Sequence, residues 1–206
     1  MIKTRITELL GIKYPIIEGG MGEKSGAKST IAISEAGGLG CVRTDPLHRI
    51  GVTNAVEVLK RELKETNEST EKPFSVNIKA SRYLPSEGIT EQYRQCFELT
   101  LEEVEKDSSL KRKLVAIVTS AGDPRGYAPR IKEAGIKWIH KITAPRQLER
   151  LLREGLRPDA VIAMGYAAAA HIGWAHLDSI VFIPSVVAVA RNEGIQFIDS
   201  GGYCDG

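Results

Sequence analysis

The sequence predicts an α/β fold in which parallel strands alternate with helices. Short apolar runs recur along the 206-residue chain, and the segments between them carry apolar residues at helical spacing. Glycine, proline and helix-capping residues separate the two kinds of segment. Seven strands can be counted, and this alternation is typical of a parallel sheet with helical crossovers. Alternation alone does not distinguish a closed barrel from an open doubly wound sheet.

The strands are expected where apolar or β-branched residues are bounded by turn residues. Pro15 opens the first strand, a position that suits proline because it needs no ladder hydrogen bond. The sixth strand is a continuous apolar run, as expected of a parallel strand buried on both faces. The seven predicted strands span residues 16–18, 39–43, 74–79, 114–119, 137–142, 160–163 and 196–199.

Most predicted helices have a recognisable start or stop. Gly11 ends an amphipathic lead-in, Ser29 or Thr30 is expected to cap the helix at 31–36, and Pro145 opens a later helix. Pro184 interrupts the last helix, so we expect a first-turn or kinked position there. The predicted helices span residues 2–13, 31–36, 53–66, 90–104, 124–135, 145–155 and 179–191.

The composition is that of an ordinary soluble globular protein, and the cysteines favour a cytoplasmic one. A net charge of +2, with no dense run of basic residues, argues against nucleic acid and against an acidic membrane surface. The most apolar window, residues 160–175, is too short to span a bilayer, and the N-terminus lacks the apolar core of a signal peptide. Cys41, Cys96 and Cys204 are odd in number and far apart, which favours reduced thiols.

The most suggestive stretch is residues 159–173, a buried strand followed by a loop of small residues that ends in His171 and Gly173. Small side chains let a ligand approach backbone N–H groups. His171 is a titratable group just past the carboxyl end of a strand, where α/β proteins place their chemistry. The alternative is that residues 167–170 are simply helix-forming alanines and His171 an ordinary surface histidine.

Several nucleotide, metal and esterase motifs are absent. Residues 20–26 read GxGxxxG, not the GxGxxG of a dinucleotide site, and no P-loop follows in register. No GxSxG elbow occurs. His171 and His176 are five residues apart, which does not match the helical spacing of a zinc site, so no metal is expected.

Seven stretches in order resemble the nitronate monooxygenase family, once called 2-nitropropane dioxygenases. The flavin-dependent enoyl-acyl-carrier-protein reductases are similar and share the scaffold. The resemblance covers essentially the whole chain. The stretches that carry it are residues 6–21, 35–40, 74–77, 140–142, 159–165, 170–173 and 200–206.

The resemblance implies a TIM (β/α)8-type barrel that binds FMN at the carboxyl ends of its strands. Residues 1–206 would then be a single FMN-binding domain that lacks the eighth β/α unit, with seven strands visible. His171 matches the family's active-site histidine. The residues expected at the cofactor are Gly20, Met21, Asn77, Lys141, Met164, Gly165, Ala169, Gly201 and Gly202, the last two beside the FMN phosphate.

The implied activity is oxidation of nitronates or nitroalkanes by molecular oxygen, with FMN as cofactor and His171 as base. The partners would be a small-molecule substrate and O2, and homo-oligomerisation is left open. Two alternatives remain: a flavin-dependent enoyl-thioester reductase that uses NAD(P)H on the same fold, and a truncated or degenerate relative without catalytic activity.

Three departures from the family pattern bear on the site. Met164 stands where the family usually has glutamine, and Glu18 also replaces a glutamine. The family's Glu-Ala-Gly-Gly before the histidine is four alanines here, at residues 167–170. Alanine disfavours a positive φ, and its Cβ hinders the close approach of a flavin. Retention of the cofactor therefore depends on whether this loop accepts alanine.

Overall fold

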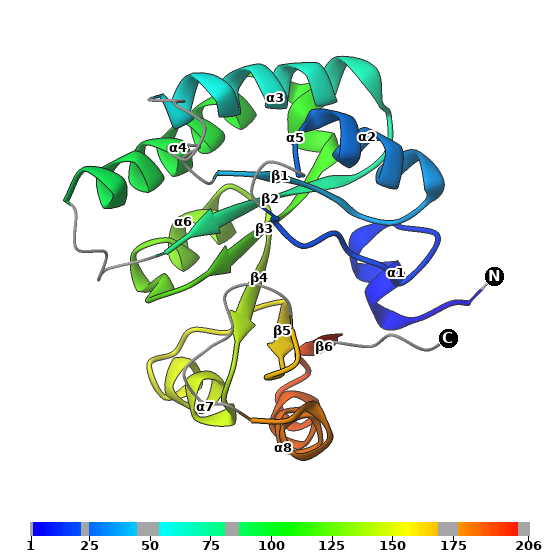
Figure 1. Cartoon of the computed structure of the whole chain (residues 1–206), viewed down its shortest axis with the longest axis vertical. Helices are drawn as coiled ribbons and strands as arrows, with labels where there is room; N and C mark the ends of the chain where they lie inside the picture. Colours follow the sequence, from blue (N-terminus) through cyan, green and yellow to red (C-terminus); the bar gives the residue numbers. More distant parts are fainter. Residues whose placement is uncertain (1, 22–24, 45–53, 81–86, 169–176, 202–206) are drawn as a thin grey trace. The chain divides into compact units, whose positions relative to one another are not determined.

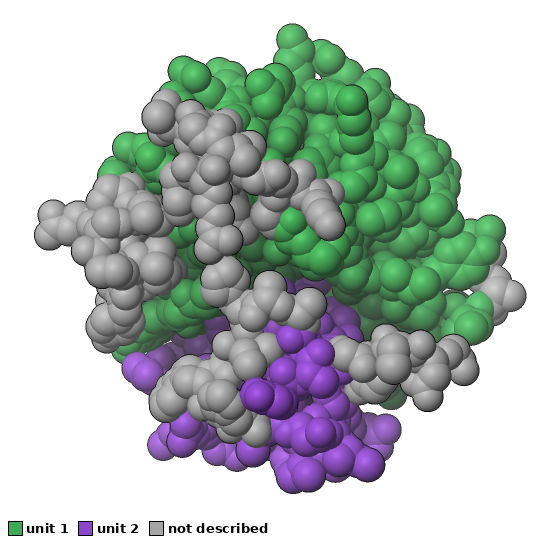
Figure 2. Space-filling view, viewed as in Figure 1, with its two compact units in different colours: residues 1–137 green, residues 138–206 purple. Residues whose placement is uncertain are grey.

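The computed structural model describes residues 2–21, 25–44, 54–80, 87–168 and 177–201 (Figure 1). The chain divides into two compact units, residues 1–137 and 138–206, which Figure 2 colours green and purple. Within the described ranges, no helix is both long and apolar enough to cross a membrane.

The first unit is built on three parallel strands that pair in chain order. They are β1 (Gly40–Arg43), β2 (Phe74–Lys79) and β3 (Leu114–Ser120). Arg43, the last residue of β1, lies opposite Asn77 of β2 in the register. The strand expected at 16–18 is reduced to an isolated parallel bridge between Ile17 and Leu39.

Helices cover the strands of this unit. α2, α3 and α4 pack against one another in succession, α2 also packs on β1 and α5 on β3 (Figure 1). The helical elements are α1 (Arg5–Leu10), α2 (Ala27–Ala36), α3 (Ala55–Ser69), α4 (Glu87–Lys106), α5 (Ser108–Lys113), the 3-10 turn η3 (Pro124–Gly126) and α6 (Ala128–Glu133).

The second unit repeats the same plan on a smaller scale. Its strands β4 (Lys137–Ile142), β5 (Ala160–Met164) and β6 (Gln196–Ser200) are parallel and again pair in chain order. Its helices are α7 (Pro145–Arg153) and α8 (Ser179–Asn192). Phe182, Val186 and Ala190 recur every fourth residue of α8 and form a core with Val161 and Ala163 of β5.

Within each unit the strands are parallel and pair in chain order, with helices between them. This order is found in a barrel and also in each half of a doubly wound sheet, whose order reverses only between the halves. The predicted α/β fold of parallel strands and helices is confirmed. The prediction of one domain over residues 1–206 stays a prediction.

Some helix boundaries differ from those expected, for local reasons. The N-cap of α2 is Gly26, and the Ser29 hydroxyl donates to the Gly26 carbonyl from inside the helix, so a cap at Ser29 or Thr30 is wrong. α4 already begins at Glu87, and α5 was not expected; the Asp107 carboxylate caps α5 by accepting from two backbone N–H groups.

Pro184 lies in the interior of α8, so a first-turn position is wrong. Proline cannot donate to the carbonyl four residues earlier, which belongs to Ile180. Pro184 is exposed and Ile180 is 81% exposed, so water can solvate that carbonyl. The start expected at Pro145 is confirmed, whereas Asp123-Pro124 opens the 3-10 turn η3, and the α-helix α6 begins only at Ala128.

Candidate functional site

In the first unit, the loop of residues 19–21 lies directly against Asn77 of β2. A Cβ atom placed on Gly20 would lie 2.9 Å from each of three Asn77 side-chain atoms, Cβ, Cγ and Nδ2. Real Cβ atoms do not approach other atoms so closely, so this contact requires glycine at position 20. The structure thus brings together two of the residues expected at the cofactor, Gly20 and Asn77. Met21, the third, is 56% exposed.

The side chain of Asn77 is buried but incompletely hydrogen-bonded. Asn77 is 3% exposed, and its Oδ1 atom has no hydrogen-bond partner among the described residues. Its main-chain carbonyl, in contrast, accepts a bond of 2.7 Å from the Thr44 hydroxyl. A buried acceptor left unpaired costs about 1–3 kcal/mol, so an N–H or O–H donor is expected there. The ring N–H of a flavin is a donor of that kind, so the Asn77 side chain fits the cofactor.

The Glu18 carboxylate completes the backbone hydrogen bonding next to β1. Leu39 N–H donates to the Ile16 carbonyl and Glu18 N–H to the Leu39 carbonyl, as in a parallel ladder. The ladder ends there, and the Glu18 Oε2 atom accepts the next N–H, that of Cys41, at 2.8 Å. Burial raises the pKa of Glu18, and the hydrogen bond from the Cys41 amide opposes the rise.

A buried ion pair between Arg43 and Glu62 joins β1 to α3. Arg43 is 5% exposed, and a guanidinium nitrogen lies 3.9 Å from Glu62 Oε1. Burial raises the pKa of Glu62, and the charge of Arg43 acts against that rise. A Cβ on Gly26 would lie 3.0 Å from Glu62 Oε1, so the Glu62 side chain packs closely against the start of α2.

In the second unit, two glycines meet at the carboxyl ends of β5 and β6. Gly165 N–H donates to the Ser200 carbonyl at 3.0 Å. Gly201 has φ +147°, which L side chains rarely adopt, and a Cβ there would lie 3.2 Å from Gly165 N. A Cβ on Gly165 would lie 2.0 Å from Ser179 Oγ. Met164, 9% exposed, pairs with Ser200 in the register, so the structure brings Met164, Gly165 and Gly201 together.

Ser179, the first residue of α8, also contributes a polar group to these glycines. Its Oγ atom is buried and has no hydrogen-bond partner in the described ranges. Nearby N–H groups are already used: Gly165 bonds Ser200, and Ala168 bonds the Gly165 carbonyl at 3.1 Å. The Ser179 hydroxyl therefore offers a donor where a phosphate is expected, although Asp178, the N-cap of α8, places an acid beside it.

Of the remaining predicted site residues, only Lys141 lies within the described part of the chain. Lys141 is half-buried in β4 and lies opposite Ile162 in the register, so pairing does not set it beside Gly165. Ala169, His171 and Gly202 lie outside the described residues. Sequence reasoning did not single out Ser25, Thr44 or Ser179. These three hydroxyls lie near Gly20, Asn77 and Gly165 in the structure. In the sequence they belong to no motif, so only their nearness to predicted strand ends could have indicated them.

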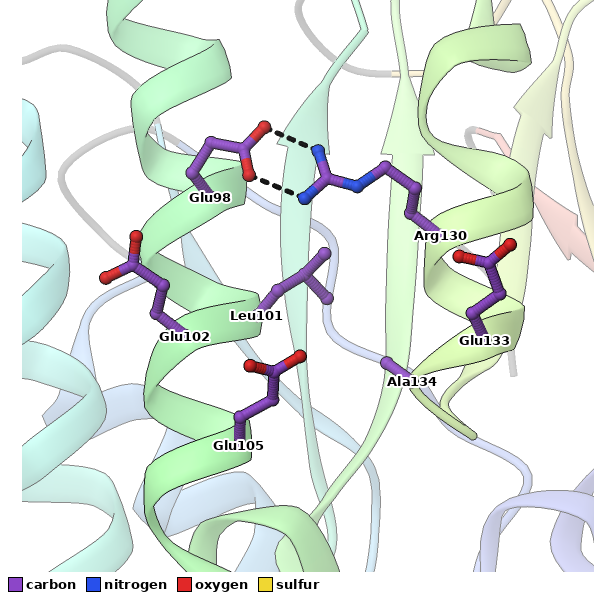
Figure 3. Close-up of a pocket in the computed structure, with 7 residues that line it drawn as sticks. All are labelled: Glu98, Leu101, Glu102, Glu105, Arg130, Glu133 and Ala134. Atoms are coloured by element: carbon purple, nitrogen blue, oxygen red, sulfur yellow. Dashed lines mark hydrogen bonds and ion pairs between the residues drawn. The ribbon is translucent and has the colours of Figure 1, made fainter.

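A separate cavity of about 310 Å³ lies between α4 and α6 (Figure 3). Figure 3 shows Glu98 of α4 and Arg130 of α6 joined by two hydrogen bonds, of 2.5 and 2.6 Å. Its other lining residues are Leu101, Glu102, Glu105, Glu133 and Ala134. None of the predicted site residues lines it, so it is not the predicted cofactor site.

Comparison with known proteins agrees with the resemblance read from the sequence. The family model described as nitronate monooxygenase matches residues 3–206. Among curated proteins, the chain is 29% identical over 209 residues to the (3aS,4S,5R,7aS)-5-hydroxy-7a-methyl-1-oxo-octahydro-1H-indene-4-carboxyl-CoA dehydrogenase of Mycobacterium tuberculosis, covering 100% of this chain and 50% of that protein. It is 28% identical over 235 residues to a probable nitronate monooxygenase of Staphylococcus aureus, covering 99% and 62%.

Among solved structures, FabK from Thermotoga maritima matches with a TM-score of 0.76 and 30% identity, covering 100% of this chain and 56% of that one. The chain thus spans between 50% and 62% of the length of these relatives. The family model covers nearly every residue, and together with the match to FabK it confirms the predicted α/β fold of the TIM-barrel type. The chain therefore belongs to the nitronate monooxygenase family, a family of flavin-dependent oxidoreductases.

Proposed function

We propose that the protein containing this chain binds FMN and oxidises nitronates or nitroalkanes with molecular oxygen. The observation that carries the proposal is the buried Asn77 Oδ1, which lacks a donor among the described residues. The Asn77 side chain packs against the loop of residues 19–21 so closely that position 20 must be glycine. An acceptor in this state suits a planar ring that presents an N–H group.

The residues divide into ring and phosphate contacts. Asn77 would orient the ring, while Gly20 and Met21 would bring backbone close to it. Lys141, Met164, Gly165 and Ala169 would line the same cofactor. Gly201 and Gly202 would give the phosphate access to backbone N–H groups, with the Ser179 hydroxyl as an added donor.

FMN supplies electron acceptance and the reaction with oxygen. The chain supplies the proton transfer: His171 would remove a proton from the carbon beside the nitro group, or donate a hydrogen bond to a nitronate already formed. We also propose a cytoplasmic location, and a homo-oligomeric state stays open.

A CoA thioester is the second candidate substrate. The Mycobacterium relative, at 29% identity over the whole chain, is named as a carboxyl-CoA dehydrogenase, whereas the Staphylococcus relative, at 28%, is named as a probable nitronate monooxygenase. The two identities do not separate the substrates. A flavin-dependent reductase or dehydrogenase of thioesters is therefore kept beside nitronate oxidation.

The first experiment uses the full-length protein and its visible spectrum. We expect a yellow protein, or one that becomes yellow with FMN. Oxygen uptake with propionate-3-nitronate would then support nitronate oxidation, and NADH oxidation with an enoyl thioester would support the alternative. Protein that stays colourless with FMN would contradict both and favour a non-catalytic relative.

His171→Ala tests the assigned base. General-base loss typically slows a reaction by about 10²–10⁴-fold, and we expect that loss with the neutral nitroalkane. The preformed nitronate no longer needs its proton removed, so its oxidation should slow much less. Equal losses with both substrates would refute the role of base.

A further inference from the structure

The hydroxyl of Ser25 binds both sides of Gly20. Met21 N–H donates to Ser25 Oγ at 2.8 Å, and Ser25 Oγ donates to the Gly19 carbonyl at 2.9 Å. These two bonds use the single hydroxyl proton and one of the lone pairs. They constrain the two peptide groups that flank Gly20, and so they determine where its backbone lies.

Ser25 is itself held in place. The residue is fully buried, and its main-chain carbonyl accepts from Arg43 N–H at 3.2 Å. Arg43 ends β1 and lies opposite Asn77 in the register. The hydroxyl is therefore anchored to the same strand ends that carry Asn77.

The loop held in this way is the one that packs on Asn77. With 2.9 Å between a Cβ on Gly20 and the Asn77 side chain, the loop backbone leaves no spare room. A shift of the loop towards β2 would push on the Asn77 side chain, and a shift away would remove its packing, and the Oδ1 atom of that side chain is the proposed contact to the cofactor. A short side chain of an adjacent turn thus controls the geometry of the site without touching the ligand.

We propose that Ser25 is a positioning residue, whose hydroxyl bonds to Met21 N–H and the Gly19 carbonyl hold the loop at Gly20 in the shape that presents Asn77 to FMN. The inference rests on the proposed function for its ligand. It adds a residue that acts through Gly20 and Asn77.

Ser34 provides a matched control. It is 1% exposed, its hydroxyl accepts from Gly40 N–H at 3.2 Å and donates to the Pro73 carbonyl at 3.0 Å. The number and kind of bonds are therefore the same. Gly40 and Pro73 lie at the amino ends of β1 and β2, whereas Ser25 acts at the carboxyl ends.

The test compares Ser25→Ala and Ser34→Ala in the full-length protein, with FMN as the probe. In flavin-free protein, Ser25→Ala should speed hydrogen exchange of the Met21 amide by about tenfold, and Ser34→Ala should not. With FMN, Ser25→Ala should raise the Kd about tenfold and change the visible circular dichroism of bound flavin. Ser34→Ala should lower the thermal midpoint of the flavin-free protein and leave both flavin readings unchanged.

Equal FMN affinity in wild type and Ser25→Ala would overturn the proposal, and so would equal losses of affinity in the two variants. Wild-type protein that binds no FMN overturns the proposed function itself, an outcome read from the wild type alone. If Ser25→Ala is not folded, Ser25→Cys keeps a group of similar size with far weaker hydrogen bonding and takes its place.

Discussion

Both units have glycines near the carboxyl ends of their strands, but the glycines contact different groups in the two units. In the first unit, Gly20 makes room for an amide side chain whose Oδ1 lacks a partner among the described residues. In the second unit, Gly165 and Gly201 make room for each other's backbone and for Ser179. In both units a buried polar atom next to the glycine, Asn77 Oδ1 or Ser179 Oγ, has no hydrogen-bond partner among the described residues, but only in the second unit do two glycine backbones also pack on each other. Glycine at a strand end therefore does not by itself identify a ligand contact, because close packing of the backbone also requires it.

The largest expected effect concerns the packing role of Gly201. Gly201→Ala adds a Cβ 3.2 Å from Gly165 N at φ +147°, and overpacking of this kind costs about 1–3 kcal/mol. We expect a loss of about 2 kcal/mol in the free energy of unfolding, measured by urea denaturation of the flavin-free protein. Gly194→Ala is the control, because its φ is +69° and nothing lies within 4 Å of the added Cβ. Equal losses would show that close packing is not what requires glycine at 201.

Asn77→Leu tests the unpaired amide of the first unit. Replacing an unsatisfied buried polar group with an apolar group of similar shape can be neutral or stabilising, so the flavin-free protein should not lose stability. The FMN Kd should rise about tenfold, since one hydrogen bond to the ring is lost. Fluorescence titration with FMN and urea denaturation measure the two quantities. Loss of stability with unchanged FMN affinity would mean that Asn77 is structural.

Ser179→Ala sharpens the contrast from the second unit. Its buried hydroxyl also lacks a partner among the described residues, so its removal should raise the free energy of unfolding by up to about 1 kcal/mol. If the phosphate uses mainly backbone N–H groups, the FMN Kd should change by less than about threefold. A tenfold loss of affinity would instead mean that each unit contributes one side chain to FMN binding, Asn77 in the first and Ser179 in the second.

The smallest effect is a pH dependence at Glu18. Its pKa is raised above the ordinary value of 4.5 in the folded state, so its contribution to stability is present below about pH 4.5 and is lost as the pH rises through the folded pKa. Glu18→Gln keeps an acceptor for Cys41 N–H and removes the charge. The variant should match wild type near pH 4 and be more stable than wild type near pH 7, as measured by urea denaturation.

Glu71→Gln provides a control of opposite sign. Arg112 and then Lys113 lower the pKa of Glu71, so any contribution of that carboxylate is present above pH 4.5 and is lost as the pH falls. Glu71 is exposed, and the expected effect is small because solvent screens its charge. A stability difference between Glu18→Gln and wild type that is the same at pH 4 and pH 7 would contradict the buried-carboxylate account.

The sequence by itself determined most of the order of strands and helices, the helix end at Gly11, the helix start at Pro145, and the family, because these are read from local spacing and from motifs in chain order. Only the tertiary structure decided what each glycine contacts. Gly20 meets Asn77, and Gly165 meets Ser179, across stretches of chain whose pairing depends on strand register. It likewise showed that the Glu18 carboxylate extends the ladder of β1. Local propensity carries no information on contacts between distant residues, since burial and register arise only when the strands assemble.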